Sequence, residues 1–141
     1  MSYWILKTEP STYSFADLVR ERRTRWDGVG NPVALRNIRS MRKGDDVMIY
    51  HTGGEKAVVG FARVASEPYP DPADQTGKLV VVDLDAGPPI GTPVTLAAIK
   101  ADPAFKDLAL VRQGRLSVVQ VPAPLWKRLV GMGRGEGADQ D

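Results

Sequence analysis

The chain has 141 residues, 43% of them hydrophobic, which suffices for one domain around one core but not for two ordinary domains. It has no cysteine and one histidine, so disulfides, thiol catalysis and zinc sites built from cysteine or several histidines are excluded. The formal net charge is only +2, but basic residues prevail over residues 19–46 and 100–130, and acidic residues over 61–99. This distribution is compatible with one basic face and, equally, with a solvated surface of mixed charge.

The chain shows no signal for a membrane or a metal. No apolar run approaches the ~20 residues that a membrane-spanning helix needs, and the start of the sequence lacks a basic leader followed by an apolar stretch. We therefore expect a cytoplasmic protein. The acidic residues lack the spacing of a calcium- or magnesium-binding loop, so we expect no metal and no other cofactor.

The first third of the chain predicts one strand and two helices. Residues 3–6 form a short strand, and Ser14 with Asp17 makes a capping box for a helix whose apolar face is Phe15, Leu18 and Val19. A short polar loop is expected next, because Trp26 is flanked by charged residues and followed by glycines. Asn31 and Pro32 are typical of a second helix start, and this helix runs to a stop at Lys43-Gly44.

The middle of the chain predicts β-structure. Residues 46–52 and 57–66 flank the sequence Gly-Gly-Glu-Lys, which is typical of a hairpin turn. A proline-rich loop over 67–78 leads to a buried strand over 79–84, and Gly87-Pro88-Pro89 is expected to turn the chain.

The last third predicts a short helix over 96–101 capped by Thr95, a strand over 115–121, and a helix after Pro122. Residues 131–141 are glycine-rich and polar, which predicts a disordered tail after a domain over residues 1–130. Several short strands with helices between them favour an α+β domain on a small, partly open barrel that leaves a groove for a ligand.

Five segments, in this order, resemble the EVE domain, the PUA-like module of the thymocyte nuclear protein family. They are Tyr3-Trp4-Ile5-Leu6-Lys7-Thr8-Glu9-Pro10; Trp26-Asp27-Gly28-Val29-Gly30-Asn31; Lys43-Gly44-Asp45 followed by Tyr50-His51-Thr52; Val59-Gly60 followed by Tyr69-Pro70-Asp71; and Arg115-Leu116-Ser117-Val118. The resemblance covers roughly residues 2–130. It implies a PUA-like pseudobarrel of short, mostly antiparallel strands with peripheral helices. It also implies binding of DNA or RNA through a modified base, in some members a modified cytosine, turned out into a pocket.

The chain departs from the family pattern at three positions. Gly30 stands where the family commonly carries arginine, which removes a contact to a phosphate or a base. Thr8 replaces a frequent serine but keeps the hydroxyl, and Gln120 replaces a usual proline. These departures concern the choice of ligand more than the fold.

A pocket for an extruded base needs a flat stacking surface, neutral hydrogen-bonding groups for the base edge, and positive charge for the flanking phosphates. Trp26 can provide the stack, Asn31, Thr8 and Ser117 can bond the base edge, and Gly28 allows close approach of the backbone. The phosphate contacts expected besides Lys7 and Arg115 are Arg25 and Arg36. The full ligand-binding set is Lys7, Thr8, Trp26, Gly28, Val29, Asn31, Tyr50, His51, Tyr69, Arg115, Leu116 and Ser117.

Each of these residues also has a structural alternative. Trp26 can cap the core beneath a loop, Asn31 can serve as a helix cap, and Ser117 can bond the backbone within a strand. Lys7 and Arg115 can be solvated or paired with Glu9 or Asp27. Tyr69 is either a rigid pocket rim or a surface cover, while Trp4 and Trp126 are assigned to the core.

Three functions remain open at this stage. The leading one is a non-catalytic reader of a modified base in nucleic acid. The second is a small hydrolytic or base-modifying enzyme in which His51 acts with Asp27 or Asp71, although no nucleophile motif accompanies the histidine. The third is a module that binds another protein or a small metabolite.

Overall fold

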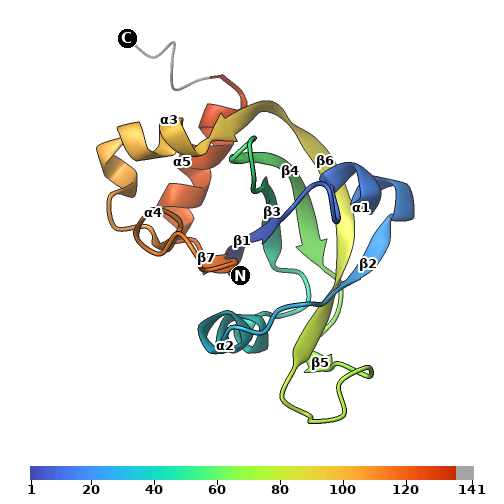
Figure 1. The fold of residues 1–141 in the computed structure, drawn as a ribbon. Coiled ribbons are helices and arrows are strands. Elements are labelled where there is room, and N and C mark those ends of the chain that lie inside the picture. Colours follow the sequence, from blue (N-terminus) through green and yellow to red (C-terminus); the bar gives the residue numbers. More distant parts are fainter. Residues whose placement is uncertain (136–141) are drawn as a thin grey trace.

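The fold is built on one curled mixed sheet, seen in the computed structural model, which describes residues 1–135 (Figure 1). Its strands are β1 (Tyr3–Thr8), β2 (Arg23–Trp26), β3 (Asp46–His51), β4 (Ala57–Val64), β5 (Tyr69–Pro70), β6 (Val80–Thr95) and β7 (Val118–Gln120). Their order is β2-β6-β4-β3-β1-β7, and β5 pairs with β6 outside this path. Among the described strands only β1 and β3 are parallel. The expected α+β class with mostly antiparallel strands is confirmed.

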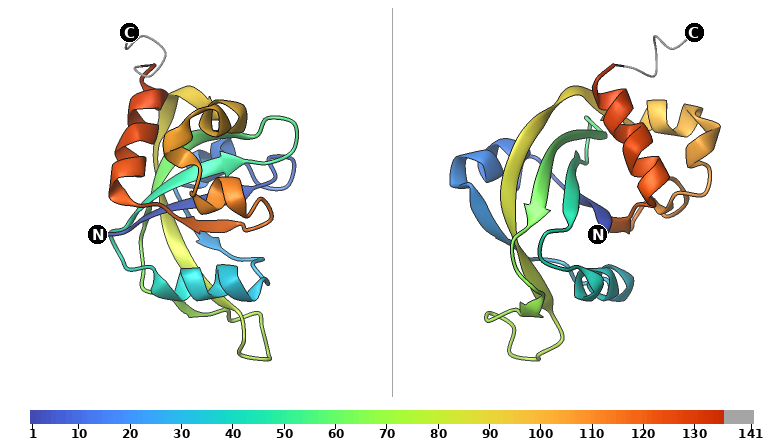
Figure 2. Two further views of the ribbon diagram at one scale, coloured as in Figure 1. Left: turned by 90° about the vertical axis from the view of Figure 1, so that its left-hand side faces the viewer. Right: turned by 180° about the vertical axis from the view of Figure 1, so that it is seen from behind.

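The helices lie around the sheet on different sides. They are α1 (Phe15–Glu21), α2 (Pro32–Ser40), α3 (Leu96–Ala101), the 3-10 helix η1 (Pro103–Phe105), α4 (Ala109–Arg112) and α5 (Ala123–Gly133). Helices α3, α4 and α5 gather on one side of the sheet, α1 lies on the opposite side, and α2 lies below both (Figure 2). None of the helices within residues 1–135 is long and apolar enough to cross a membrane.

Local capping determines where the first two helices begin. The Ser14 hydroxyl accepts from the backbone N–H of Asp17 at 3.1 Å, and the Asp17 carboxylate accepts from the N–H of Ser14 at 2.8 Å, so the capping box is confirmed. Phe15 and Leu18 are buried as expected. Val19, however, is 45% exposed, because it lies one position beyond the buried stripe of this short helix.

Two aromatic side chains at the start of β1, Tyr3 and Trp4, pack on opposite faces of the strand. The indole Nε1 of Trp4 donates to Asp45 at 3.0 Å, and this buried carboxylate also accepts from the backbone N–H groups of Ser2 and Arg42. Tyr3, on the other face of the same strand, stacks on Trp126 of α5 with ring centroids 4.8 Å apart. The expected core positions of Trp4 and Trp126 are confirmed, and Asp45 is stabilised by three donors despite its burial.

Two predicted elements differ from the structure because long-range pairing overrides the local pattern. Trp26 is not in a loop: it ends β2, lies opposite Val82 of β6 and is 7% exposed. Gly87-Pro88-Pro89 does not turn the chain, since β6 continues through irregular pairing with β4. A side chain at position 87 would meet the Phe61 carbonyl at 2.9 Å, so glycine permits this close approach.

Smaller differences concern the end of the chain. The strand expected over 115–121 is limited to Val118–Gln120, because residues 114 and 115 form a turn. Helix α5 continues to Gly133, so residues 131–133 of the expected tail are helical. The remainder of that prediction, from residue 136 onward, lies outside the described residues.

Candidate nucleic-acid interface

Several of the expected site residues meet where β1 ends. The parallel register of β1 and β3 places Lys7 beside Tyr50 and Thr8 beside His51. On the other side of β1, the backbone N–H of Lys7 donates to the carbonyl of Ser117 at 3.0 Å. Three segments that are far apart in the sequence therefore bring five expected residues to one end of the sheet.

These residues divide between the two faces of the sheet, because neighbouring side chains in a strand point to opposite faces. The Thr8 hydroxyl donates to the carbonyl of Tyr13 at 2.6 Å, and the Tyr13 ring meets the edge of Trp26 with centroids 6.1 Å apart. Lys7 points the other way: its Nζ donates to the carbonyl of Gly114 at 2.8 Å and lies 5.6 Å from the centre of the Tyr50 ring. The expected residues at this end of the sheet are thus divided between its two faces.

His51 has both ring nitrogens engaged. Nε2 accepts from the backbone N–H of Phe15 at 3.0 Å, so in the neutral ring the proton is on Nδ1, which faces a Glu55 oxygen at 2.7 Å. Neither Asp27 nor Asp71 is a hydrogen-bond partner of this ring. This geometry suits a structural histidine that holds α1 in place, and it gives no support to a catalytic base.

The glycine-rich segment after β2 presents Asn31 at the start of α2. Its Oδ1 accepts from the backbone N–H groups of Val33 and Ala34 at 2.9 and 3.1 Å, which confirms the capping alternative. Its Nδ2 donates to no other residue within 1–135, so the amide protons of this exposed side chain are available to a ligand. Gly28 has φ +78°, which favours glycine, whereas Gly30 has ordinary φ and open space around it.

Arg25 and Tyr69 lie away from this end of the sheet. Arg25 precedes Trp26 in β2, so its side chain points to the opposite face, and its Nε donates to the Tyr69 hydroxyl at 3.3 Å. The Tyr69 hydroxyl in turn donates to Asp83 at 2.6 Å, and this bond, with desolvation, raises the pKa of Tyr69. Tyr69 lines a separate surface pocket of about 480 Å³ with Arg39 and Arg42. Arg25 and Tyr69 therefore form a hydrogen-bonded pair that is separate from the residues at the end of β1.

The remaining expected residues flank the end of β1. Arg36 on α2 and Arg115 in the turn before β7 are both exposed, and neither side chain has an ion pair or hydrogen bond within residues 1–135. Leu116 and Val29 are buried and contribute packing. The Asn37 amide donates to the carbonyl of Val118 at 2.8 Å, which fastens α2 to β7 and so fixes the position of Arg36.

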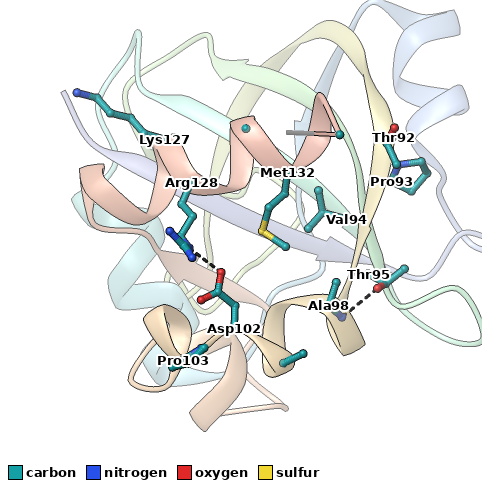
Figure 3. Close-up of a pocket in the computed structure, with 13 residues that line it drawn as sticks. Thr92, Pro93, Val94, Thr95, Ala98, Asp102, Pro103, Lys127, Arg128 and Met132 are labelled. Carbon is teal, nitrogen blue, oxygen red and sulfur yellow. Dashed lines mark hydrogen bonds and ion pairs between the residues drawn. The ribbon is translucent and has the colours of Figure 1, made fainter. Parts of the chain in front are cut away.

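The largest of the four main pockets within residues 1–135 is elsewhere. It has a volume of about 850 Å³ and lies between the end of β6, α3 and α5, and none of the expected site residues lines it (Figure 3). Arg128 points to Asp102, with Nε 2.6 Å from the carboxylate, while Lys127 extends away from the cavity. The ion pair ties α5 to the start of η1.

A smaller pocket of about 240 Å³ adjoins the end of β1 and contains Lys7 and Tyr50 from the expected set. It is also lined by Lys56, Lys100 and Thr52, which the sequence-based reasoning missed. The available signal was weak: Lys56 ends the hairpin turn and Lys100 lies on a short helix. Trp26 lines none of the four main pockets of residues 1–135. Nor does any cluster of three or more His, Asp or Glu in this range suit a metal ion.

A curled mixed sheet with peripheral helices and polar groups at the end of its first strand defines a PUA-like α+β domain. Residues 2–132 match the EVE domain, and the chain belongs to this family. A Rhodopseudomonas palustris protein solved by NMR is 44% identical, with a TM-score of 0.90 over 94% of this chain and 93% of that one. The human THYN1 protein, in complex with DNA that contains 5-methylcytosine, is 23% identical, with a TM-score of 0.86 over 94% of this chain and 98% of that one.

Curated relatives match over a shorter range. Human thymocyte nuclear protein 1 is 32% identical in an alignment 82 residues long that covers 50% of this chain and 36% of the relative. The alignment therefore spans about a third of the length of the curated relatives that the chain matches.

Proposed function

We propose that this chain is a DNA-binding module that reads a modified base, in particular a modified cytosine, at the end of β1. The observation that carries the proposal is the shared fold. This chain belongs to the EVE family, and the human THYN1 protein, which has a similar structure, is complexed with DNA that contains 5-methylcytosine. The chain's own residues at the end of β1 supply chemistry that is compatible with this ligand.

The polar groups near the end of β1 suit the edge of a neutral base. The free Nδ2 protons of Asn31 are donors, and the hydroxyl of Ser117 has no partner within residues 1–135. Neutral donors and acceptors bind a neutral heterocycle without leaving a buried charge unpaired. The free guanidinium groups of Arg36 and Arg115 are suited to phosphates on either side.

Trp26 is proposed as the aromatic wall of the base pocket. Since it is only 7% exposed and meets the Tyr13 ring, a base can stack on it only if the half-buried Tyr13 moves aside. Base stacking on an aromatic side chain contributes about 1–3 kcal/mol, which offsets such a rearrangement of a side chain. A base turned out of the duplex would enter from the side of Asn31.

The proposal is tested by fluorescence-anisotropy titration of duplexes that differ by a single 5-methylcytosine, with RNA of the same sequence as a further ligand. Asn31→Asp is the informative variant, because aspartate keeps the helix cap but replaces the amide donor by a carboxylate. We expect the preference for the modified duplex to fall by a factor of roughly 5 to 150, since one base-edge contact discriminates by about 1–3 kcal/mol.

Gln75→Glu is the matched control, because it adds the same negative charge in the exposed loop between β5 and β6, outside the expected site. It is expected to keep the preference. Equal affinity of the unsubstituted protein for modified and unmodified duplexes would overturn the proposal. Tighter binding of the RNA would show that RNA, and not DNA, is the preferred ligand.

A further inference from the structure

The pocket of about 240 Å³ beside the end of β1 has an unusual charge. We call it the lysine pocket, because Lys7, Lys56 and Lys100 line it and no acidic residue does. It lies on the face of the sheet that carries α3 and α4, whereas Thr8 and Trp26 belong to the opposite face. The other lining residues are Tyr50, Thr52, Gly53, Leu96, Leu110, Val111 and Gly114.

Lys7 provides a partly desolvated ammonium at the base of this pocket. Its side chain is half-buried, and desolvation lowers its pKa. One N–H bonds to the carbonyl of Gly114, and the ammonium also faces the Tyr50 ring, which leaves donors for a further acceptor. An anion bound in the pocket would replace the water contacts that the Lys7 ammonium group loses on burial.

Lys56 and Lys100 bring two more charges from other segments. Neither side chain has an ion pair or hydrogen bond within residues 1–135. The carbonyl of Lys56 accepts from Leu96 at the start of α3 at 2.8 Å, and Lys100 follows Leu96 by one helical turn. Both lysines are therefore held next to the same pocket.

The backbone at Lys56 points to a role for its side chain. Its φ is +46°, in the left-handed region where glycine or asparagine is the less strained choice. Strained backbone of this kind gathers at ligand-binding positions. If this residue served only to form the hairpin turn, glycine would adopt the conformation with less strain.

We propose that the lysine pocket binds a phosphate group, and that in the complex with DNA this is a backbone phosphate near the base being read. The second half of the statement rests on the proposed function. Three ammonium groups provide donors to phosphate oxygens, while Leu96, Leu110 and Val111 exclude water and so strengthen the attraction. The Thr52 hydroxyl is directed instead to the Thr8 carbonyl and the Glu9 carboxylate.

The first experiment measures the salt dependence of DNA binding for Lys56→Gln, Lys100→Gln and the double variant. Each lost phosphate contact reduces the slope of log K against log salt by about one unit. We expect this reduction and a several-fold loss of affinity, equal for modified and unmodified duplexes. The control is Lys106→Gln, which removes an exposed lysine between η1 and α4 that does not line the pocket, and it should leave the slope unchanged.

The second experiment uses inorganic pyrophosphate as the probe and follows backbone amide signals by NMR. We expect saturable shifts at Gly53 and Gly114 in the unsubstituted protein, and their loss in the double lysine variant, while Lys106→Gln retains them. This experiment needs no DNA. It therefore tests phosphate binding in the lysine pocket even if the protein binds no duplex and the proposed function fails.

The two experiments separate the sources of the phosphate. Reduced salt slopes support a backbone phosphate. If pyrophosphate shifts the amide signals but the salt slopes of the lysine variants are unchanged, the pocket does not bind a DNA phosphate. It would then be a site for a free phosphate compound. Unchanged slopes together with no shifts at Gly53 and Gly114 would overturn the whole proposal.

Discussion

The Nε2 atom of His51 accepts a hydrogen bond of 3.0 Å from the backbone N–H of Phe15, the first residue of α1. This N–H has no partner inside the helix, because it belongs to the first turn. The bond fixes the start of α1 against the end of β3 and thereby positions Tyr13, whose ring contacts Trp26. The single histidine thus supports the part of the candidate interface that contains Tyr13 and Trp26.

Replacing His51 should lower stability. His51→Ala leaves a buried N–H without an acceptor, so we expect the free energy of unfolding to fall by about 1–3 kcal/mol in urea denaturation. Glu55→Gln is the control: the amide oxygen still accepts from Nδ1–H, and the loss should stay below that of His51→Ala. Unchanged stability of His51→Ala would show that the Phe15 bond contributes nothing.

Restoring an arginine at position 30 should strengthen DNA binding. The position has ordinary φ, and a Cβ there would meet no atom within 4 Å, so Gly30→Arg adds a cation beside Asn31 without strain. We expect higher affinity and a salt slope that is steeper by about one unit in anisotropy titrations. Gln75→Arg, in the exposed loop before β6, adds the same charge elsewhere and should have less effect. Equal gains from both variants would indicate a non-specific charge effect.

Removing the ring of Trp26 should be costly for the fold itself. Because the side chain is buried opposite Val82, Trp26→Ala is expected to reduce the free energy of unfolding by about 3–5 kcal/mol. Trp26→Phe retains an aromatic partner for Tyr13 and should cost less. A loss of stability below about 1 kcal/mol for the alanine variant would contradict the burial of this ring.

The loop between β5 and β6 should loosen in acid. The Asp74 carboxylate accepts from the backbone N–H groups of Leu79 and Thr76 and from the Thr76 hydroxyl, and these bonds lower its pKa from 3.8 to about 2. A lowered folded-state pKa gives stabilisation that is present above about pH 4 and is lost as the pH falls through about 2.

We therefore expect the Asp74 carboxyl carbon to titrate near pH 2 in NMR. The difference in stability between the unsubstituted protein and Asp74→Asn should shrink as the pH falls over this range. Asp107→Asn, which removes a carboxylate bound to the Arg112 side chain instead of to backbone N–H groups, is the control. A titration of Asp74 near its usual value would contradict the assigned hydrogen bonds.

Local chemistry in the sequence was enough for the elements that depend on neighbours in the chain. The capping box at Ser14, the cap at Asn31 and the hairpin between β3 and β4 need only a few consecutive residues, and all three are confirmed. The ordered motifs also identified the family and its PUA-like fold. The division of Lys7 and Thr8 between opposite faces could have been inferred as well, since it follows from the period of two along a strand.

Only the tertiary structure decided the features that need distant partners. Trp26 ends a strand because β6 offers Val82 and its neighbours for pairing, although the local sequence is polar. The prolines after Gly87 remain within β6 because irregular pairing with β4 accommodates them. The lysine pocket joins β1, a hairpin turn and α3, and no local pattern indicates that Lys7, Lys56 and Lys100 meet. The sequence thus determined the family and the local elements, while packing between remote segments determined which side chains share a site.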